Sequence, residues 1–266
     1  MPDDVVLYEV REGVAHITLN RPERLNAFNR RMTLELSRCW QRFKTDESAD
    51  VAIITGMGRA FSAGADLRDD SEPSHLPNND PLLYPWLGSG GAGMGVWPRE
   101  LKLGKPTIAA VNGTALGVGG VIALQCDLRV CVEKTGTIGY PLVRAGLMPP
   151  RLQDLWLLAP PAMALRALMT GEAITPEDAY RVGLVNEVVS ADRLLDTATE
   201  LAQQIRRNAP LAVRAVKEMW DADPSYQDAI LLRMYQTMQS VVNGSHDLQE
   251  GVQAFRERRA PEWTGR

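Results

Sequence analysis

Two loops of small residues could together hold a carbonyl oxygen. The first loop, residues 60–67, reads Ala-Phe-Ser-Ala-Gly-Ala-Asp-Leu, and the second, residues 110–120, reads Ala-Val-Asn-Gly-Thr-Ala-Leu-Gly-Val-Gly-Gly. Because Gly and Ala leave room for close approach, each loop can bring a backbone N–H near a ligand oxygen. Two N–H groups aimed at one oxygen form an oxyanion hole, which stabilises developing negative charge. The loops therefore predict activation of a carbonyl compound such as a thioester.

The side chains that would move protons at such a site are few. No carboxylate occurs from residue 135 through residue 153, although paired carboxylates suit general acid–base chemistry. Other groups that could act are Tyr140, Asp154 and His75. An imidazole suits proton transfer near neutral pH, whereas a histidine in a polar loop is more often a solvated residue. The sequence leaves the identity of the acid or base open.

The first half of the chain has the pattern of strands and short helices. Residues 5–10 and 14–19 are rich in β-formers and meet at Glu12-Gly13, which predicts a hairpin. Apolar residues recur at helical spacing over residues 28–43. Further short apolar runs predict buried strands at residues 51–55, 107–111 and 128–132, and a buried helix at residues 121–124. Residues 68–97 are irregular, and we expect this long loop to cover the substrate.

The second half has the pattern of helices. Thr175-Pro176-Glu177-Asp178 is a strong helix start, with a capping hydroxyl, proline at the first position and acids in the first turn. Apolar stripes run along residues 194–205 and 230–242. Together they offer more apolar faces than one domain of this size needs, which predicts contacts between subunits.

The overall composition is that of an ordinary globular protein. The 266 residues are 45% hydrophobic and 23% charged, and the formal charge of −4 gives no reason to expect nucleic acid or an anionic membrane as partner. The first residues lack the basic and apolar regions of a signal peptide. Cys39, Cys126 and Cys131 show no metal spacing and lie in apolar runs. We therefore expect a cytoplasmic protein with reduced thiols and no bound metal.

Several segments, taken together, resemble the crotonase superfamily, the enoyl-CoA hydratase/isomerase group. They are residues 16–22 with Asn26-Ala27, residues 61–67, residues 110–113 through 127, residues 170–171 with 179–185, and residues 250–251 with Phe255 and Arg259. The resemblance implies an α/β fold, a crotonase-like spiral of ββα units over residues 1–190. It also implies a helical oligomerisation region over residues 191–266, which would build a homotrimer or a dimer of trimers.

The resemblance also implies where an acyl-CoA would bind. By position, the two oxyanion N–H groups belong to Ala63 and Val118, and Val118 replaces a glycine of many relatives. Arg258 takes the place of a lysine near the adenosine phosphates, where a guanidinium would make bidentate contacts. The other residues expected beside CoA are Leu25, Ala27, Ala65, Asp66 and Leu67. No separate cofactor is implied, because coenzyme A enters as part of the substrate.

The sequence departs from the family pattern at the two acids. Hydratases of the family use two glutamates to place and deprotonate water, and those positions are Val121 and Leu142 here. Neither side chain transfers a proton. We therefore expect an acyl-CoA-binding enzyme that stabilises a thioester enolate and is a poor hydratase. The alternative is a catalytically silent acyl-CoA carrier or interaction protein.

Overall fold

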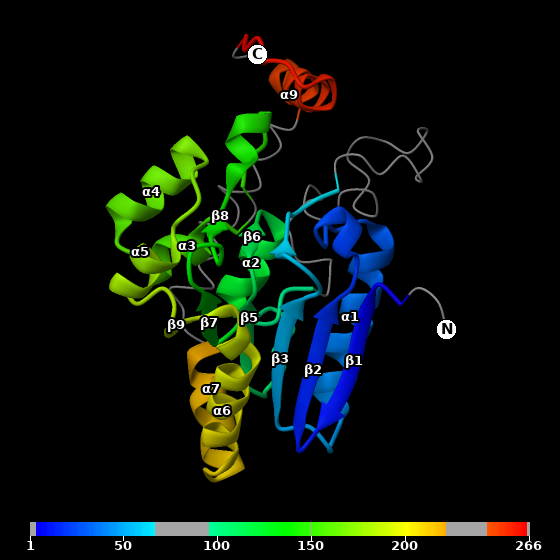
Figure 1. The fold of residues 1–266 in the computed structure, drawn as a ribbon, viewed down its shortest axis with the longest axis vertical. Helices are drawn as coiled ribbons and strands as arrows, with labels where there is room; N and C mark the ends of the chain where they lie inside the picture. Colours follow the sequence, from blue (N-terminus) through cyan, green and yellow to red (C-terminus); the bar gives the residue numbers. More distant parts are fainter. Residues whose placement is uncertain (1–3, 67–95, 150, 222–243, 265–266) are drawn as a thin grey trace.

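The fold is built on two sheets whose strands alternate along the chain (Figure 1). The computed structural model describes residues 4–66, 96–149, 151–221 and 244–264. The larger sheet has the strand order β1-β2-β3-β5-β7-β9, and the smaller has the order β4-β6-β8. Among the strands of the described residues, β1 and β2 pair antiparallel, and the other strand pairs are parallel. The expected α/β class is confirmed.

The strands of the larger sheet agree closely with the sequence pattern. They are β1 (Val6–Arg11), β2 (Val14–Leu19), β3 (Val51–Gly56), β5 (Thr107–Val111), β7 (Leu128–Val132) and β9 (Glu187–Val189). The turn between β1 and β2 has positive φ at both Glu12 (46°) and Gly13 (72°). Such a turn matches the right-handed twist of a hairpin, so the hairpin predicted at Glu12-Gly13 is confirmed.

The smaller sheet explains the repeated pattern of the spiral. Its strands are β4 (Ala60–Ser62), β6 (Thr114–Leu116) and β8 (Ile138–Gly139). Each follows within a few residues of a strand of the larger sheet, so that β3 with β4, β5 with β6, and β7 with β8 form successive units. Parallel pairing brings equivalent ends of the strands to one edge. The loop after β4 and the loop after β6 therefore lie next to each other.

Helices cover the sheets and connect the units. They are α1 (Arg30–Thr45), α2 (Val118–Gln125), α3 (Gln153–Leu158), α4 (Pro161–Thr170), α5 (Pro176–Arg181), α6 (Leu194–Arg206), α7 (Pro210–Asp221) and α9 (His246–Glu257), with short 3-10 turns η1 (Pro22–Arg24), η2 (Pro141–Ala145) and η3 (Ala191–Arg193). No helix of the described ranges is both long and apolar enough to cross a bilayer.

Two hydrophobic clusters lie on the two faces of the larger sheet. On β3, Ala52 and Ile54 join the cluster that holds α1, whereas Val51 and Ile53 join the cluster that holds α6. This alternation follows from the two-residue period of a strand. The α6 stripe, which includes Leu194, Ala198 and Ala202, is buried against the sheet of its own chain. It was expected at a subunit contact, and that expectation is wrong because the sheet takes up this face.

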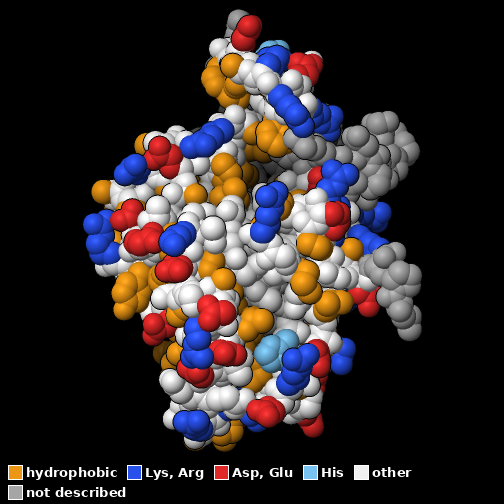
Figure 2. All heavy atoms as spheres, in the orientation of Figure 1, with side chains coloured by type: hydrophobic (Ala, Val, Ile, Leu, Met, Phe, Trp, Pro, Cys, Tyr) orange, Lys and Arg blue, Asp and Glu red, His pale blue; other side chains and the backbone are white. Residues whose placement is uncertain are grey.

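The C-terminal part presents its apolar surface elsewhere. On α7, Leu211, Val216 and Met219 are 78%, 71% and 76% exposed. Helix α9 contacts η2 and stands apart from the two sheets (Figure 1). The second predicted stripe, residues 230–242, lies outside the described residues. Charged side chains of both signs are interspersed over the described part of the face in Figure 2.

Candidate functional site

The first small-residue loop is held by a network around Asn26. The Ser62 hydroxyl donates to Asn26 O at 2.8 Å and accepts the Gly64 N–H at 3.1 Å. The Ala63 N–H donates to Leu25 O at 2.9 Å. Ala63 was expected to supply an oxyanion N–H, but this donor is already engaged within the loop. The structure therefore corrects that assignment.

The N–H of Ala65 is the donor that this loop leaves available. Its neighbours pair with the chain at Phe28, because Gly64 O accepts the Phe28 N–H at 2.7 Å and the Asp66 N–H donates to Phe28 O at 2.9 Å. Successive peptide groups of an extended chain point in opposite directions, so the Ala65 N–H points away from Phe28. Within the described part of the chain no acceptor is recorded for it.

The second loop ends in the buried helix α2. Gly117 has φ of 53° and donates its N–H to Gly139 O at 2.9 Å. Val118 is the first residue of α2, so its N–H is one of the first four that have no acceptor inside a helix. The aligned peptide dipoles add positive potential there. The positive φ lies at Gly117, and Val118 itself has the helical backbone that valine accepts.

The two loops are in direct contact. A Cβ atom on Gly64 would lie 2.8 Å from Leu116 O, and one on Gly119 would lie 2.6 Å from Ser62 Cβ. A side chain at either glycine would push the loops apart. The Ala65 N–H and the Val118 N–H therefore belong to adjoining segments, as an oxyanion hole requires.

The two positions at which the resemblance places the acids of the family are apolar and packed. Val121 is fully buried in the main hydrophobic cluster. Leu142, on η2, is partly buried, and its Cδ1 would lie 3.4 Å from a Cβ placed on Gly117. Leu142 thus lies against the second loop itself. Tyr140, directly before η2, is fully buried in the same cluster. Neither Val121 nor Leu142 can exchange a proton.

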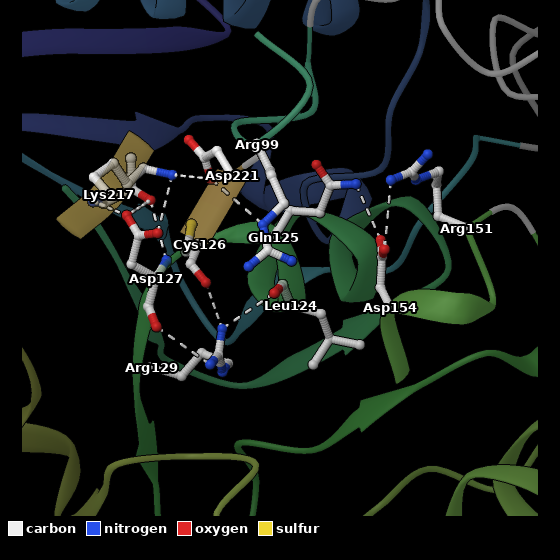
Figure 3. Close-up of polar contacts among 11 residues, drawn as sticks. Arg99, Leu124, Gln125, Cys126, Asp127, Arg129, Arg151, Asp154, Lys217 and Asp221 are labelled. Atoms are coloured by element: carbon white, nitrogen blue, oxygen red, sulfur yellow. Dashed lines mark hydrogen bonds and ion pairs between the residues drawn. The ribbon is translucent and has the colours of Figure 1, made fainter. Parts of the chain in front are cut away.

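A buried arginine holds the other end of α2 (Figure 3). The Arg129 guanidinium donates to Leu124 O at 3.2 Å, to Cys126 O at 2.5 Å and to Leu184 O at 2.7 Å. Burial lowers the pKa of Arg129, while the nearby Cys126 and Asp127 oppose the shift. The positive group lies where the helix dipole is negative. Arg129 therefore fixes α2, and with it the Val118 N–H.

Next to Arg129, an ion-pair network ties α7 to the end of α2. Lys217 Nζ lies 3.0 Å from Asp127 Oδ1 and 2.7 Å from Asp221 Oδ1. Arg99 Nε lies 3.5 Å from the same Asp221 oxygen, and its guanidinium stacks on Trp220 at 4.4 Å. Figure 3 shows the charged side chains Arg99, Asp127, Lys217 and Asp221 converging from three segments of the chain. The network positions residues 96–103 against the core.

A second polar cluster joins α2, α3 and the segment that carries Arg99. Gln125 Nε2 donates to Asp154 Oδ2 at 3.0 Å. Arg151 lies 3.6 Å from Asp154 Oδ1 and 2.6 Å from Glu100 Oε1. Gln125 and Asp154 are each 1% exposed. Burial raises the pKa of Glu100 to about 7, Arg151 opposes the rise, and Asp154 adds to it. We call these four residues the Gln125–Glu100 cluster.

Some of the residues expected beside CoA lie near the first loop. Leu25 and Ala27 belong to the turn that receives the Ala63 N–H and the Arg21 side chain. The Asp66 carboxylate pairs with Arg21 at 3.0 Å, and both side chains are largely buried, so Asp66 orders its loop. Leu67 and His75 lie outside the described residues.

The cation expected at the phosphates lies at the far end of the chain. Arg258 is exposed at the end of α9, with φ of 59°. Within the described ranges its guanidinium has no recorded ion pair, whereas the adjacent Arg259 is bound by Glu250 at 2.6 Å and by Glu257 at 2.6 Å. Of the two arginines, Arg258 is therefore the one that could bind an external anion.

Comparison with known proteins agrees with this architecture. The model of the enoyl-CoA hydratase/isomerase family matches residues 9–266. The chain belongs to this family. It is 36% identical to an (E)-benzylidenesuccinyl-CoA hydratase of Thauera aromatica, over 98% of this chain and 99% of that protein. It is 39% identical to a carnitinyl-CoA dehydratase of Salmonella enteritidis, over 98% of each chain.

The solved structures extend the agreement to the fold. A carnitinyl-CoA dehydratase from Mycobacterium avium superposes with a TM-score of 0.82 at 34% identity, over 99% of this chain and 100% of that one. The fold of this enoyl-CoA hydratase/isomerase family member is therefore shared along its whole length, and the crotonase-like spiral is confirmed.

The structure adds two residues, Gln125 and Glu100, that the sequence pattern did not identify as candidate site residues. Gln125 is the only polar residue of α2 and is buried, and Glu100 meets Arg151 across a large sequence separation. A lone glutamine within an apolar helix is a signal that could have found Gln125. No sequence signal pairs Glu100 with Arg151, because the pair depends on the path of the chain.

Proposed function

We propose that this protein binds an acyl-CoA and stabilises the enolate of its thioester in an oxyanion hole formed by the N–H groups of Ala65 and Val118. The observation that carries the proposal is the pair of unengaged N–H groups on two loops in contact. In a site that excludes water, such donors act strongly on developing negative charge. The relatives named above are a hydratase and a dehydratase of CoA thioesters, which supports a lyase-type enzyme.

The proton chemistry differs from that of a two-glutamate hydratase. Val121 and Leu142 cannot hold or deprotonate water, so efficient hydration of a simple enoyl-CoA is not expected. Tyr140 and Asp154 remain the described candidates for proton transfer. Asp154 is committed to Gln125 and Arg151, which makes it a poorer candidate for direct contact with the α-carbon.

Exchange of the α-hydrogens of a saturated acyl-CoA tests the proposal without assuming a product. In D₂O, an enzyme that forms the enolate replaces these hydrogens with deuterium, and NMR follows the loss of signal. Catalysed exchange of butyryl-CoA above the rate of the heat-denatured protein supports the proposal. Binding without exchange, and without turnover of any enoyl-CoA, would leave only the silent carrier.

The silent acyl-CoA carrier is the second candidate, because both family acid positions are apolar. A carrier needs the loops for binding but no proton-transfer group. It predicts calorimetric affinity for acyl-CoA together with an exchange rate equal to the background. The two candidates therefore differ in one measurement on the same complex.

We further propose a homotrimer or a dimer of trimers. Leu211, Val216 and Met219 give α7 an exposed apolar face, and a face of this kind marks an interaction site. Residues 191–266 would supply the contacts, with α7 in place of the buried stripe of α6. Light scattering at micromolar concentration tests this, and a monomer contradicts it. We expect the protein to work in the cytoplasm.

A further inference from the structure

Gln125 carries a buried acceptor that the described residues leave unused. Its side chain is 1% exposed, and its Nε2 donates to Asp154. Its Oε1 has no hydrogen-bond donor among the residues that the structure describes. A buried polar atom without a partner costs free energy that a bound donor would recover. A bound group that donates a hydrogen bond would satisfy this atom.

Gln125 lies on the helix face that begins at the oxyanion hole. Val118, Val121 and Gln125 are spaced three and four residues apart, which places them on one side of α2. The helix rises by about 1.5 Å per residue, so Gln125 lies about 10 Å beyond Val118 along its axis. Gln125 therefore lies on the same side of α2 as Val118, at about the separation that the length of a short acyl chain would span.

The charges around Gln125 favour a donor over an acceptor. The Gln125–Glu100 cluster contains two carboxylates, Asp154 and Glu100, and one guanidinium, Arg151. Arg151 already lies between the two carboxylates. An added hydroxyl or ammonium group would meet acceptors there, whereas an added carboxylate would meet like charge.

We propose that the Gln125–Glu100 cluster is an acyl-recognition subsite that binds a hydroxyl or ammonium group at the distal end of the acyl chain, with Gln125 Oε1 as the acceptor. The proposal rests on acyl-CoA binding at the two loops. A site built to accept a hydrogen bond rejects an analogue that lacks the donor, because its own polar group then stays unpaired. A plain hydrocarbon tail is therefore the wrong substrate class.

Four CoA thioesters of equal chain length test the subsite on the full-length protein. They are hexanoyl-CoA and its derivatives with a terminal hydroxyl, amino or carboxylate group, and calorimetry measures the affinity of each. We expect the hydroxyl or amino compound to bind about tenfold or more tightly than hexanoyl-CoA, the gain from one good hydrogen bond. The carboxylate compound should show no gain.

Variants of the protein test which side chain causes the preference among the four compounds. Gln125→Met keeps the length of the side chain and removes its acceptor, so it should bind the four compounds with nearly equal affinity. Glu172→Gln is the matched control for charge removal, since Glu172, just after α4, forms an exposed ion pair with Arg166 of that helix. It should keep the preference of the parent. If Gln125→Met does not fold, Glu100→Gln serves instead, and it should weaken the preference for the amino compound.

The outcomes separate the subsite from the proposed function. Equal affinity for all four compounds overturns the subsite and leaves acyl-CoA binding intact. A preference for the carboxylate compound also overturns it, because Arg151 would then be the recognising group. An unchanged preference in Gln125→Met, or an unchanged preference for the amino compound in Glu100→Gln, assigns recognition to other residues and overturns it as well. Binding of none of the four compounds refutes the proposed function itself.

Discussion

Exchange of one backbone N–H for an ester oxygen separates the roles of Ala63 and Ala65. Replacing either alanine by L-lactic acid keeps the methyl side chain, removes the N–H donor and makes the preceding carbonyl oxygen a weaker acceptor. The Ala65 N–H has no recorded acceptor among the described residues, whereas the Ala63 N–H donates to Leu25 O at 2.9 Å. The two esters therefore form a matched pair in one loop, each with the same chemical change.

The two esters should lose different properties: the Ala65 ester loses catalytic rate, and the Ala63 ester loses folding free energy. Loss of one oxyanion donor costs about 2.7–4 kcal/mol of transition-state stabilisation, a decrease of about 10²–10³ in rate. The Ala65 ester should therefore lose catalysed exchange of the butyryl-CoA α-hydrogens and keep most of its stability. Loss of the Ala63 donor leaves Leu25 O unpaired, which costs about 1–3 kcal/mol of folding free energy. That ester should melt at a lower temperature and, where folded, exchange at nearly the parent rate.

Two measurements on each ester show which N–H acts on the thioester: the exchange rate by NMR and the free energy of unfolding by denaturant titration. Circular dichroism confirms that the protein assayed is folded. The reasoning is refuted if the Ala63 ester loses exchange by about 10² while folded, or if the Ala65 ester exchanges like the parent. Either result would place the thioester oxygen elsewhere in the loop.

Four further predictions concern the apolar acid positions, two arginines and Glu100. The parent should hydrate crotonyl-CoA poorly, and Val121→Glu combined with Leu142→Glu should raise the rate if the variant folds, because general acid–base groups contribute about 10²–10⁴ each; a spectrophotometric hydration assay that shows no rise in a folded variant contradicts the assigned positions. Arg258→Ala should weaken CoA binding by about 1–3 kcal/mol in calorimetry, the scale of a lost charged hydrogen bond, and unchanged affinity would remove Arg258 from the site. Arg129→Met should lower the free energy of unfolding by at least about 3 kcal/mol in denaturant titration, since several buried carbonyl oxygens lose their donor. A loss below about 1 kcal/mol would show that the hydrogen bonds of Arg129 at the end of α2 are dispensable. Because burial raises the pKa of Glu100 to about 7, folding favours its neutral form, so the free energy of unfolding should fall as pH rises from about 4.5 to 7; Glu100→Gln should lessen that fall, and identical pH profiles would contradict the burial argument.

Local pattern in the sequence determined most of the fold. The hairpin at Glu12-Gly13, helix α1 and strands β3, β5 and β7 follow from alternation, helical spacing and turn residues, which act over a few positions. The helix that starts at Thr175 has the predicted cap, with the Thr175 hydroxyl accepting the Asp178 N–H at 3.2 Å. These signals are local, so they can be read without knowledge of the partners.

The sequence by itself also predicted that two small-residue loops could hold a ligand oxygen, and it determined that Val121 and Leu142 are apolar. Which N–H of the first loop is available was decided by tertiary structure, because Leu25 O takes the Ala63 donor across a gap of 38 residues. The same holds for the α6 stripe, which the sheet buries, and for the pairing of Glu100 with Arg151. A hydrogen bond or an ion pair between distant residues depends on where the chain returns, and local propensity carries no information about that return.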